Sequence, residues 1–161
     1  MLGDDALRRH LLELLRSSGA HMTFEEAVKD FPSSRINERF PNASYGAWQL
    51  LEHMRIAQRY SLSLITDDQC EELRWPDDYW PSPQVEASSE HWEQTMTGFL
   101  ADLRALCRLV EDPATDLGRL LPHGNGYTVG REIIVAGDHN SYHIGELAIM
   151  RQAMGAWPAT R

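Results

Sequence analysis

The 161-residue sequence predicts an all-α fold, a four-helix bundle with long connections that forms one domain over residues 1–161. Three observations carry this prediction. Four long segments repeat their apolar residues every three or four positions, which is the period of an amphipathic helix. No stretch alternates apolar and polar residues for long enough to predict a strand. The length fits a single domain of ordinary size.

The first helix is predicted over residues 4–16, where leucines recur on one side. A second, short helix is expected to begin after Thr23, because Glu26 three residues later completes a capping box. This helix ends before Pro32. Residues 32–44 are rich in proline, serine and asparagine and read as a connection.

The next long helix is predicted over residues 44–65, with Ser44 as its N-cap. Another follows over residues 85–111, where apolar residues from Trp92 to Val110 recur at intervals of four and three residues. Such a regular seam is typical of helices that pack in a bundle.

A long loop, residues 66–84, separates these two helices and contains Trp75, Tyr79 and Trp80. Loops of this length are often functional. The segment 75–81 must fold back to approach the first half of the preceding helix. We expect its aromatic side chains either to cover the mouth of a pocket there or to cap the end of the bundle core.

The last helix is predicted to begin after Thr128 and to end at Gly155. Its seam advances by four and three residues and is apolar except at the middle, where Asn140 and His143 fall on it and His139 lies beside it. The full seam is Val129, Ile133, Ala136, Asn140, His143, Leu147, Met150 and Met154.

Charge and composition exclude several classes of function. The chain has 15 basic and 24 acidic residues, a net charge of −9, so we expect no nucleic-acid partner, which would need a basic face. No apolar run is long enough to span a membrane, and the N-terminus lacks the basic residues of a secretory signal. Cys70 and Cys107 read as free thiols of a cytoplasmic protein. Bundles of this size often pair through an apolar helix face, and we expect a homodimer.

The polar residues in the last helix suggest a metal site. His139 and His143 are one helical turn apart, roughly 6 Å along one face, and can converge on one ion. Alone, such a pair is also found on ordinary helix surfaces. His53 lies near the middle of the helix over 44–65 and would supply a third imidazole nitrogen, leaving the other positions on the ion open to water or substrate.

Other metal-binding patterns do not fit. A metalloprotease motif would need glutamate directly after His139, where this chain has Asn140. A di-iron carboxylate site needs glutamate three residues before histidine, and no glutamate in the chain is placed so. A single ion with three histidine ligands remains. Glu146 and Glu52 are placed to orient an imidazole or to move a proton, although both are also ordinary helix-surface carboxylates.

Two segments resemble motifs of the DinB family of four-helix bundles. Residues 44–54, Ser-Tyr-Gly-Ala-Trp-Gln-Leu-Leu-Glu-His-Met, resemble its second-helix motif, and residues 138–147 resemble the DHxxYHxGQ stretch of its fourth helix. The resemblance implies that His53, His139 and His143 bind a divalent metal, zinc or nickel among others. It also implies kinship with enzymes that use a low-molecular-weight thiol such as mycothiol or bacillithiol. The chain departs from the family pattern at Glu146, where glutamine is common.

These observations together predict a metal-dependent enzyme that acts on a small molecule, either a hydrolase or a thiol-dependent transferase. The alternative is a non-catalytic bundle that binds a metal or a small ligand. We assign His53, His139 and His143 as metal ligands and Glu146 as the catalytic residue. Four further residues are candidates for substrate binding; they are Trp48, Trp80, Trp92 and Asn140.

Overall fold

The computed structural model describes residues 3–16, 19–40, 42–122 and 126–158, and this part of the chain is all-helical, as the sequence predicts. Its backbone also forms two isolated antiparallel β-bridges, one between Arg39 and Gly46 and one between Leu120 and Thr128. The helices are α1 (Asp4–Leu15), α2 (Phe24–Val28), α3 (Ala47–Thr66), α4 (Ser89–Glu111) and α5 (Val129–Ala153), with a 3-10 turn η1 at Ser33–Arg35.

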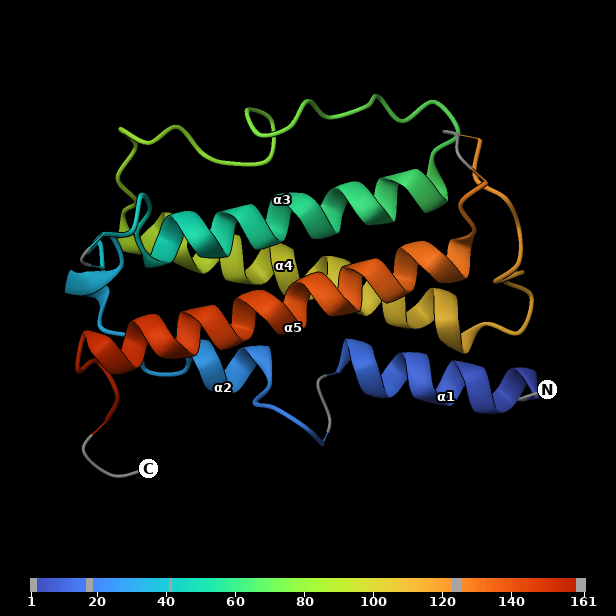
Figure 1. Ribbon diagram of the computed structural model, residues 1–161, viewed down its shortest axis with the longest axis horizontal. Coiled ribbons are helices and arrows are strands. Elements are labelled where there is room, and N and C mark those ends of the chain that lie inside the picture. Colours follow the sequence, from blue (N-terminus) through green and yellow to red (C-terminus); the bar gives the residue numbers. More distant parts are fainter. Residues whose placement is uncertain (1–2, 17–18, 41, 123–125, 159–161) are drawn as a thin grey trace.

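Three long helices lie side by side, and the two shorter ones follow each other along one side of them (Figure 1). α3 packs against both α4 and α5, and it runs antiparallel to α5. α1 packs against α4 and α5, and α2 packs against α5. The α3–α5 contact therefore brings together the two helices that carry the three candidate metal ligands.

Two predicted N-caps are confirmed. The Thr23 hydroxyl accepts a hydrogen bond from the Glu26 amide, and the Glu26 carboxylate accepts one from the Thr23 amide. The Thr128 hydroxyl accepts a hydrogen bond from the amide of Arg131 at the start of α5. In both places the side chain satisfies an amide that the helix itself leaves unpaired.

Two predicted helix starts are too early. α3 begins at Ala47, not at Ser44, because Gly46 is held extended in its bridge with Arg39. A Cβ atom at Gly46 would lie 3.0 Å from the Asn37 carbonyl oxygen, so this approach requires glycine.

α4 begins at Ser89, not at residue 85, for a related reason. The Asn37 side chain donates a hydrogen bond to the Ala87 carbonyl and accepts one from the Ala87 amide. This double hydrogen bond holds Ala87 to the segment before α3, so the helix starts only after it. Ser88 then serves as the N-cap.

The core has two apolar clusters. One surrounds Trp48, Phe99 and Leu147, and the other surrounds Leu106 and Ile133. α1 approaches α5 closely at Gly137, where a Cβ atom would lie 2.6 Å from Leu14. A larger residue at position 137 would therefore push α1 away from α5.

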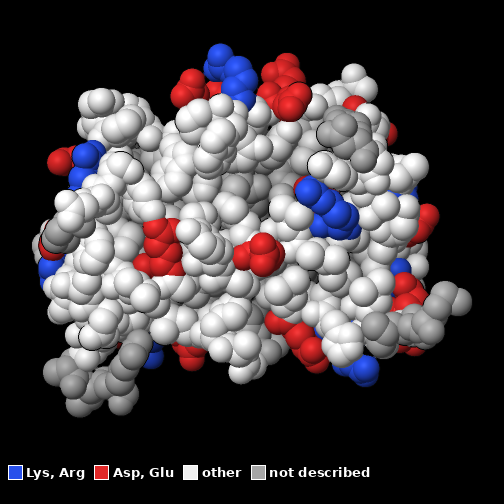
Figure 2. All heavy atoms as spheres, viewed as in Figure 1, with Lys and Arg blue, Asp and Glu red and all other residues white. Residues whose placement is uncertain are grey.

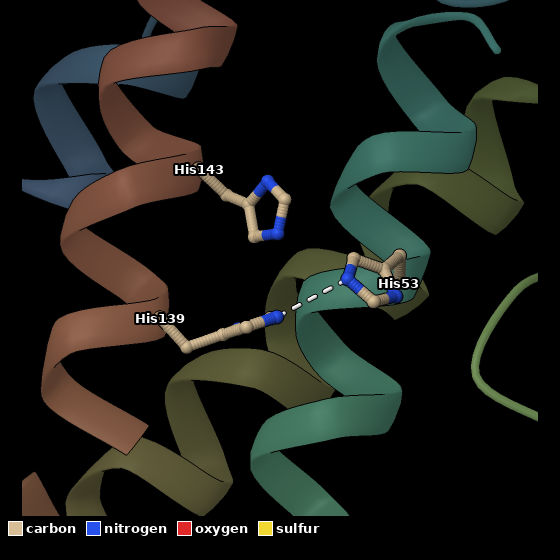
Figure 3. Close-up of side chains that lie close together, drawn as sticks. All are labelled: His53, His139 and His143. Carbon is tan, nitrogen blue, oxygen red and sulfur yellow. Dashed lines mark hydrogen bonds between the residues drawn. The ribbon is translucent and has the colours of Figure 1, made fainter. Parts of the chain in front are cut away.

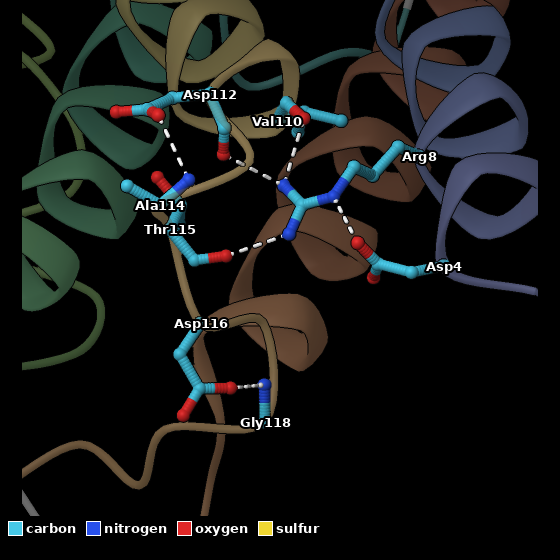
Figure 4. Close-up of polar contacts among 8 residues, drawn as sticks. All are labelled: Asp4, Arg8, Val110, Asp112, Ala114, Thr115, Asp116 and Gly118. Atoms are coloured by element: carbon cyan, nitrogen blue, oxygen red, sulfur yellow. Dashed lines mark hydrogen bonds and ion pairs between the residues drawn. The ribbon is translucent and has the colours of Figure 1, made fainter.

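One buried arginine ties α1 to the end of α4 (Figure 4). Arg8 donates hydrogen bonds to the carbonyl oxygens of Val110, Asp112 and Thr115, and its Nε pairs with Asp4. The last carbonyl groups of a helix have no partner within the helix. Arg8 satisfies such groups from a distant element, and we call these residues the Arg8 cluster.

The long loop between α3 and α4 runs back along the outside of α3 (Figure 1). It therefore passes close to the first half of that helix, as the sequence analysis required. Among the described residues, no helix is both long and apolar enough to cross a membrane.

Candidate metal centre

The three predicted ligands converge between α3 and α5 (Figure 3). His139 and His143 lie one turn apart on α5, and His53 faces them from α3. One ring nitrogen from each lies within 4.8 Å of the other two. His53 and His143 are buried and His139 is partly exposed. We call these three residues the histidine cluster.

Two of the three imidazoles are held in orientation by hydrogen bonds at their Nδ1 atoms. The Nδ1 atom of His53 lies 2.9 Å from the Tyr79 carbonyl oxygen, and the Nδ1 atom of His143 lies 2.7 Å from a carboxylate oxygen of Glu146. Because these oxygens only accept hydrogen bonds, each Nδ1 carries the proton. The Nε2 atoms of His53 and His143 are then unprotonated, which is the form that binds a metal.

The spacing of the nitrogens suits one ion. The Nε2 atoms of His53 and His139 are 3.1 Å apart. Two nitrogens bound at the usual zinc distance, with angles between 90° and 109°, would be about 2.9–3.4 Å apart. All three ligand nitrogens lie within 4.8 Å of one another, so small movements of the rings would bring them to these separations around an ion.

Burial favours the neutral form of two of the three imidazoles. It lowers the pKa of His53, and it lowers the pKa of His139 to about 4, with smaller contributions from the neighbouring imidazoles. A neutral imidazole has a free lone pair for a metal, so these rings need not lose a proton to bind one near neutral pH.

Glu146 lies behind the cluster instead of inside it. One carboxylate oxygen accepts the hydrogen bond from His143, and the other accepts one from the Tyr45 hydroxyl. Burial and this hydrogen bond raise the pKa of Tyr45, so the phenol remains a donor. In this arrangement Tyr45 fixes Glu146, and Glu146 in turn fixes the His143 ring.

The loop supplies the wall next to His53. The Trp80 ring stacks on the His53 ring, with centroids 3.9 Å apart and an interplanar angle of 1°. The Tyr79 carbonyl holds the same imidazole, and the Trp75 ring approaches it edge-on at 6.3 Å. The segment 75–81 thus folds back onto the first half of α3.

A cavity of about 550 Å³ opens beside the cluster, between α3, α5 and the loop. The face of the molecule that carries α3 and α5 is hollowed between them and has few charged side chains there (Figure 2). We call this space the α3–α5 cavity. Its walls include His53, Gln58, Tyr60, Ser61, Cys70, Glu72, Trp75, Tyr79, Tyr127, Arg131, Glu132 and His139.

The other predicted substrate-binding residues lie elsewhere. Trp48 is buried against α4, where its indole nitrogen donates a hydrogen bond to the Thr95 hydroxyl. Trp92 is buried beside the Phe31 ring. Asn140 is buried and donates a hydrogen bond to the Gln58 side chain. None of these three residues lines the α3–α5 cavity, and Trp80, which packs on His53, does not line it either.

Sequence reasoning missed Tyr45 and Tyr79 as partners of the cluster. Tyr45 directly precedes Gly46, the residue before α3. A tyrosine at this position of a sequence is usually interpreted as a residue that packs against the core. Tyr79 acts through its backbone carbonyl, for which a side-chain pattern carries no signal. Glu52, the other carboxylate considered, accepts hydrogen bonds from Arg55 and Thr95 on the far side of α3.

The chain matches no protein-family model, no curated protein and no solved structure. Its function is therefore argued from the arrangement of its own residues.

Proposed function

We propose that this chain is a metal-dependent enzyme that acts on a small molecule at the histidine cluster. The observation that carries the proposal is the convergence of three imidazole nitrogens from two helices, two of which are held by hydrogen bonds at the opposite nitrogen. Three imidazoles suit zinc and nickel among the available divalent metals. A zinc or nickel ion at this position would lower the pKa of a bound water or thiol and so produce a nucleophile near neutral pH.

The chain's own residues divide the remaining work. His53, His139 and His143 hold the ion, while Glu146 and the Tyr79 carbonyl keep two of the rings oriented. Trp80 covers one face of His53 and limits the access of water from that side. The α3–α5 cavity, which shares His53 and His139 with the cluster, is the place for the substrate.

The motifs around these residues support a DinB-like four-helix bundle made by α1, α3, α4 and α5. Hydrolysis and thiol transfer both need a metal-activated nucleophile and an adjacent organic pocket. The proposal therefore includes both reaction classes, with a low-molecular-weight thiol as the cofactor in the second. A bundle that only binds metal or ligand is the alternative outcome of the experiment below.

Metal content is the first test. The purified protein is stripped with a chelator, reloaded with zinc or nickel, dialysed and analysed for metal. We expect one equivalent for the wild type and for His10→Ala, whose imidazole is exposed on α1. His139→Ala and His143→Ala should each weaken binding about 100-fold or more and lose the ion on dialysis. Full retention of metal by both variants would refute the site.

Activity is tested next on the same samples. Wild type and metal-loaded variants are screened against esters, amides and electrophilic thiol acceptors, with and without added thiol. Turnover that requires both metal and His143 supports an enzyme, and dependence on added thiol selects transfer over hydrolysis. Metal binding without any turnover would favour the non-catalytic alternative.

We also propose that the chain forms a homodimer. Tyr142 and Ile149 lie two turns apart on one face of α5 and are 71% and 67% exposed, which is unusual for large apolar side chains. Sedimentation equilibrium at micromolar concentration should give twice the chain mass of 18.4 kDa. A single species of the chain mass would contradict this proposal without affecting the metal site.

A further inference from the structure

The α3–α5 cavity extends well beyond the histidine cluster. Its volume of about 550 Å³ lies within the usual range for sites that bind organic ligands. Glu132 lies seven residues before His139 on α5, so the two are about 10 Å apart along the helix. Because α3 runs antiparallel, the wall opposite Glu132 is the second half of α3. A ligand that fills the cavity would therefore reach from the cluster to Glu132.

Glu132 is an unusual residue for a cavity wall. Its side chain is only 4% exposed, and burying a carboxylate is costly unless it is paired. Among the described residues, the Arg131 guanidinium is its ion-pair partner, and it contacts one of the two carboxylate oxygens. Arg131 also stacks on the Tyr127 ring at 3.8 Å, so its side chain is already engaged on two sides.

The charge of the cavity wall is negative. Glu132 and Glu72 oppose one arginine among the described residues that line the cavity. Tyr79 also lines this wall, and its phenol can serve as a hydrogen-bonding group.

Aromatic rings line the cavity between the histidine cluster and Glu132. The Tyr60 and Tyr79 rings meet edge to face at 5.7 Å, and the Trp75 ring meets Tyr79 at 5.4 Å. Tyr127 completes the lining near Arg131. Aromatic faces attract cations and also accommodate apolar groups. A buried carboxylate among such rings is suited to an organic ammonium group.

We propose that the α3–α5 cavity binds an organic amine, with its ammonium group at Glu132, its apolar body between α3 and α5, and its reacting end at the histidine cluster. An anion is disfavoured because Arg131, the one arginine among the described lining residues, is already engaged by Glu132 and Tyr127. This inference rests on the proposed function, since it assigns the substrate class of the same site.

Ligand charge provides the first test. 4-Phenylbutylamine, 4-phenylbutanol and 4-phenylbutanoate have similar shapes and carry a positive, a neutral and a negative end. Calorimetric titration of the metal-free wild type should give the tightest binding for the amine and the weakest for the carboxylate. Equal affinities, or tighter binding of the carboxylate, would overturn the proposal. The measurement needs no variant to fold.

Removing the carboxylate provides the second test. Glu132→Gln keeps the shape of the side chain and removes its charge, and it should weaken amine binding about tenfold or more. Glu90→Gln makes the same change in the first turn of α4, outside the cavity, and should leave the affinity unchanged. Equal affinity of wild type and Glu132→Gln for the amine would overturn the proposal.

The two proposals fail separately. Metal-free protein that binds the amine through Glu132 but never retains an ion would refute the metal enzyme and keep the amine site. Protein that retains one ion when loaded, but in its metal-free form prefers the carboxylate ligand, would refute the amine site and keep the metal centre.

Discussion

The Arg8 cluster and the histidine cluster are both built from nitrogen-bearing side chains buried between helices, yet they use their nitrogens differently. Every nitrogen of the Arg8 guanidinium donates to an oxygen, and three of the four acceptors are backbone carbonyls at the end of α4 and in the loop that follows it. The three imidazoles instead direct nitrogens at one another, with two Nε2 atoms 3.1 Å apart. Figures 3 and 4 show the contrast.

This difference separates a structural cluster from a functional one. A buried polar group stabilises a fold when its partners are complementary, as donors and acceptors are around Arg8. In the histidine cluster, His139 Nε2–H donates a hydrogen bond to the unprotonated Nε2 of His53, and an ion bound by both nitrogens would replace that proton. We therefore expect changes at Arg8 to affect stability and changes behind the histidines to affect metal binding.

The largest effect on stability is expected for Arg8→Met. Methionine keeps the apolar stem but leaves the carbonyl oxygens of Val110, Asp112 and Thr115 without their donor. The free energy of unfolding should fall by about 2–4 kcal/mol, with little of it due to the exposed partner Asp4. Calorimetry should show a decrease in Tm of about 5–15 °C.

Metal affinity is the control for this variant. The folded fraction of Arg8→Met should bind zinc as tightly as the wild type, because Arg8 contacts no residue of the histidine cluster. A parallel loss of metal affinity and stability would show that the two clusters are coupled.

Glu146→Ala should produce the opposite pattern. It removes the acceptor that holds the His143 ring, and such a loss weakens metal binding about 10–100-fold. Glu146→Gln retains an acceptor oxygen and should recover most of the affinity, so the pair separates orientation from charge. Competition with a fluorescent zinc chelator measures both. An equal loss of zinc affinity in Glu146→Ala and Glu146→Gln would assign the effect to the negative charge of Glu146.

Acid should affect the histidine cluster and not the Arg8 cluster. His139 has a folded-state pKa of about 4 against an ordinary value of 6.5. Between these two pH values the unfolded chain binds a proton that the folded chain does not, so the stability of the metal-free protein falls as pH decreases from 6.5 to 4. Above pH 6.5 this contribution is constant.

Urea unfolding across this pH range checks the prediction. His139→Gln should lose less stability between pH 6.5 and 4 than the wild type, because it cannot take up that proton. Arg8→Met should lose as much as the wild type over the same interval. If the free energy of unfolding of His139→Gln falls with decreasing pH as steeply as that of the wild type, the titrating group is not His139.

The residues predictable from sequence were those whose role follows from helical spacing. The apolar seam of the last helix is interrupted at His143, with His139 beside it, and this interruption predicted two ligands. The position of His53 near the middle of the helix predicted over residues 44–65 supplied the third. The starts of α3 and α4 were not predictable, because Asn37 and Arg39 hold the preceding segments through contacts that no local pattern records.

Tertiary contacts also decided the parts of the site that the sequence left open. Helical spacing alone offered both Glu146 and Glu52 as partners of the histidines, and only packing shows that Glu52 turns to Arg55 and Thr95. The three tryptophans were equivalent candidates for the same reason. Packing buries Trp48 and Trp92 in the core and places Trp80 on His53.

The smallest effect is expected for Trp80→Ala, which lies at the boundary between structure and function. Trp80 stacks on His53 and on Tyr45, but it donates no hydrogen bond to either ring, and the Tyr79 carbonyl still holds the His53 imidazole. Metal content should therefore remain at one equivalent. Removing the indole takes away the ring that packs on His53, which lines the cavity, so the substrate fits less well there and KM should rise about 3–30-fold with a smaller change in kcat. Steady-state kinetics of the metal-loaded variant, with metal content measured on the same sample, test this. Unchanged kinetics together with a lower Tm would make Trp80 a structural cover for the histidine cluster, and loss of the ion would make it part of the cluster's support.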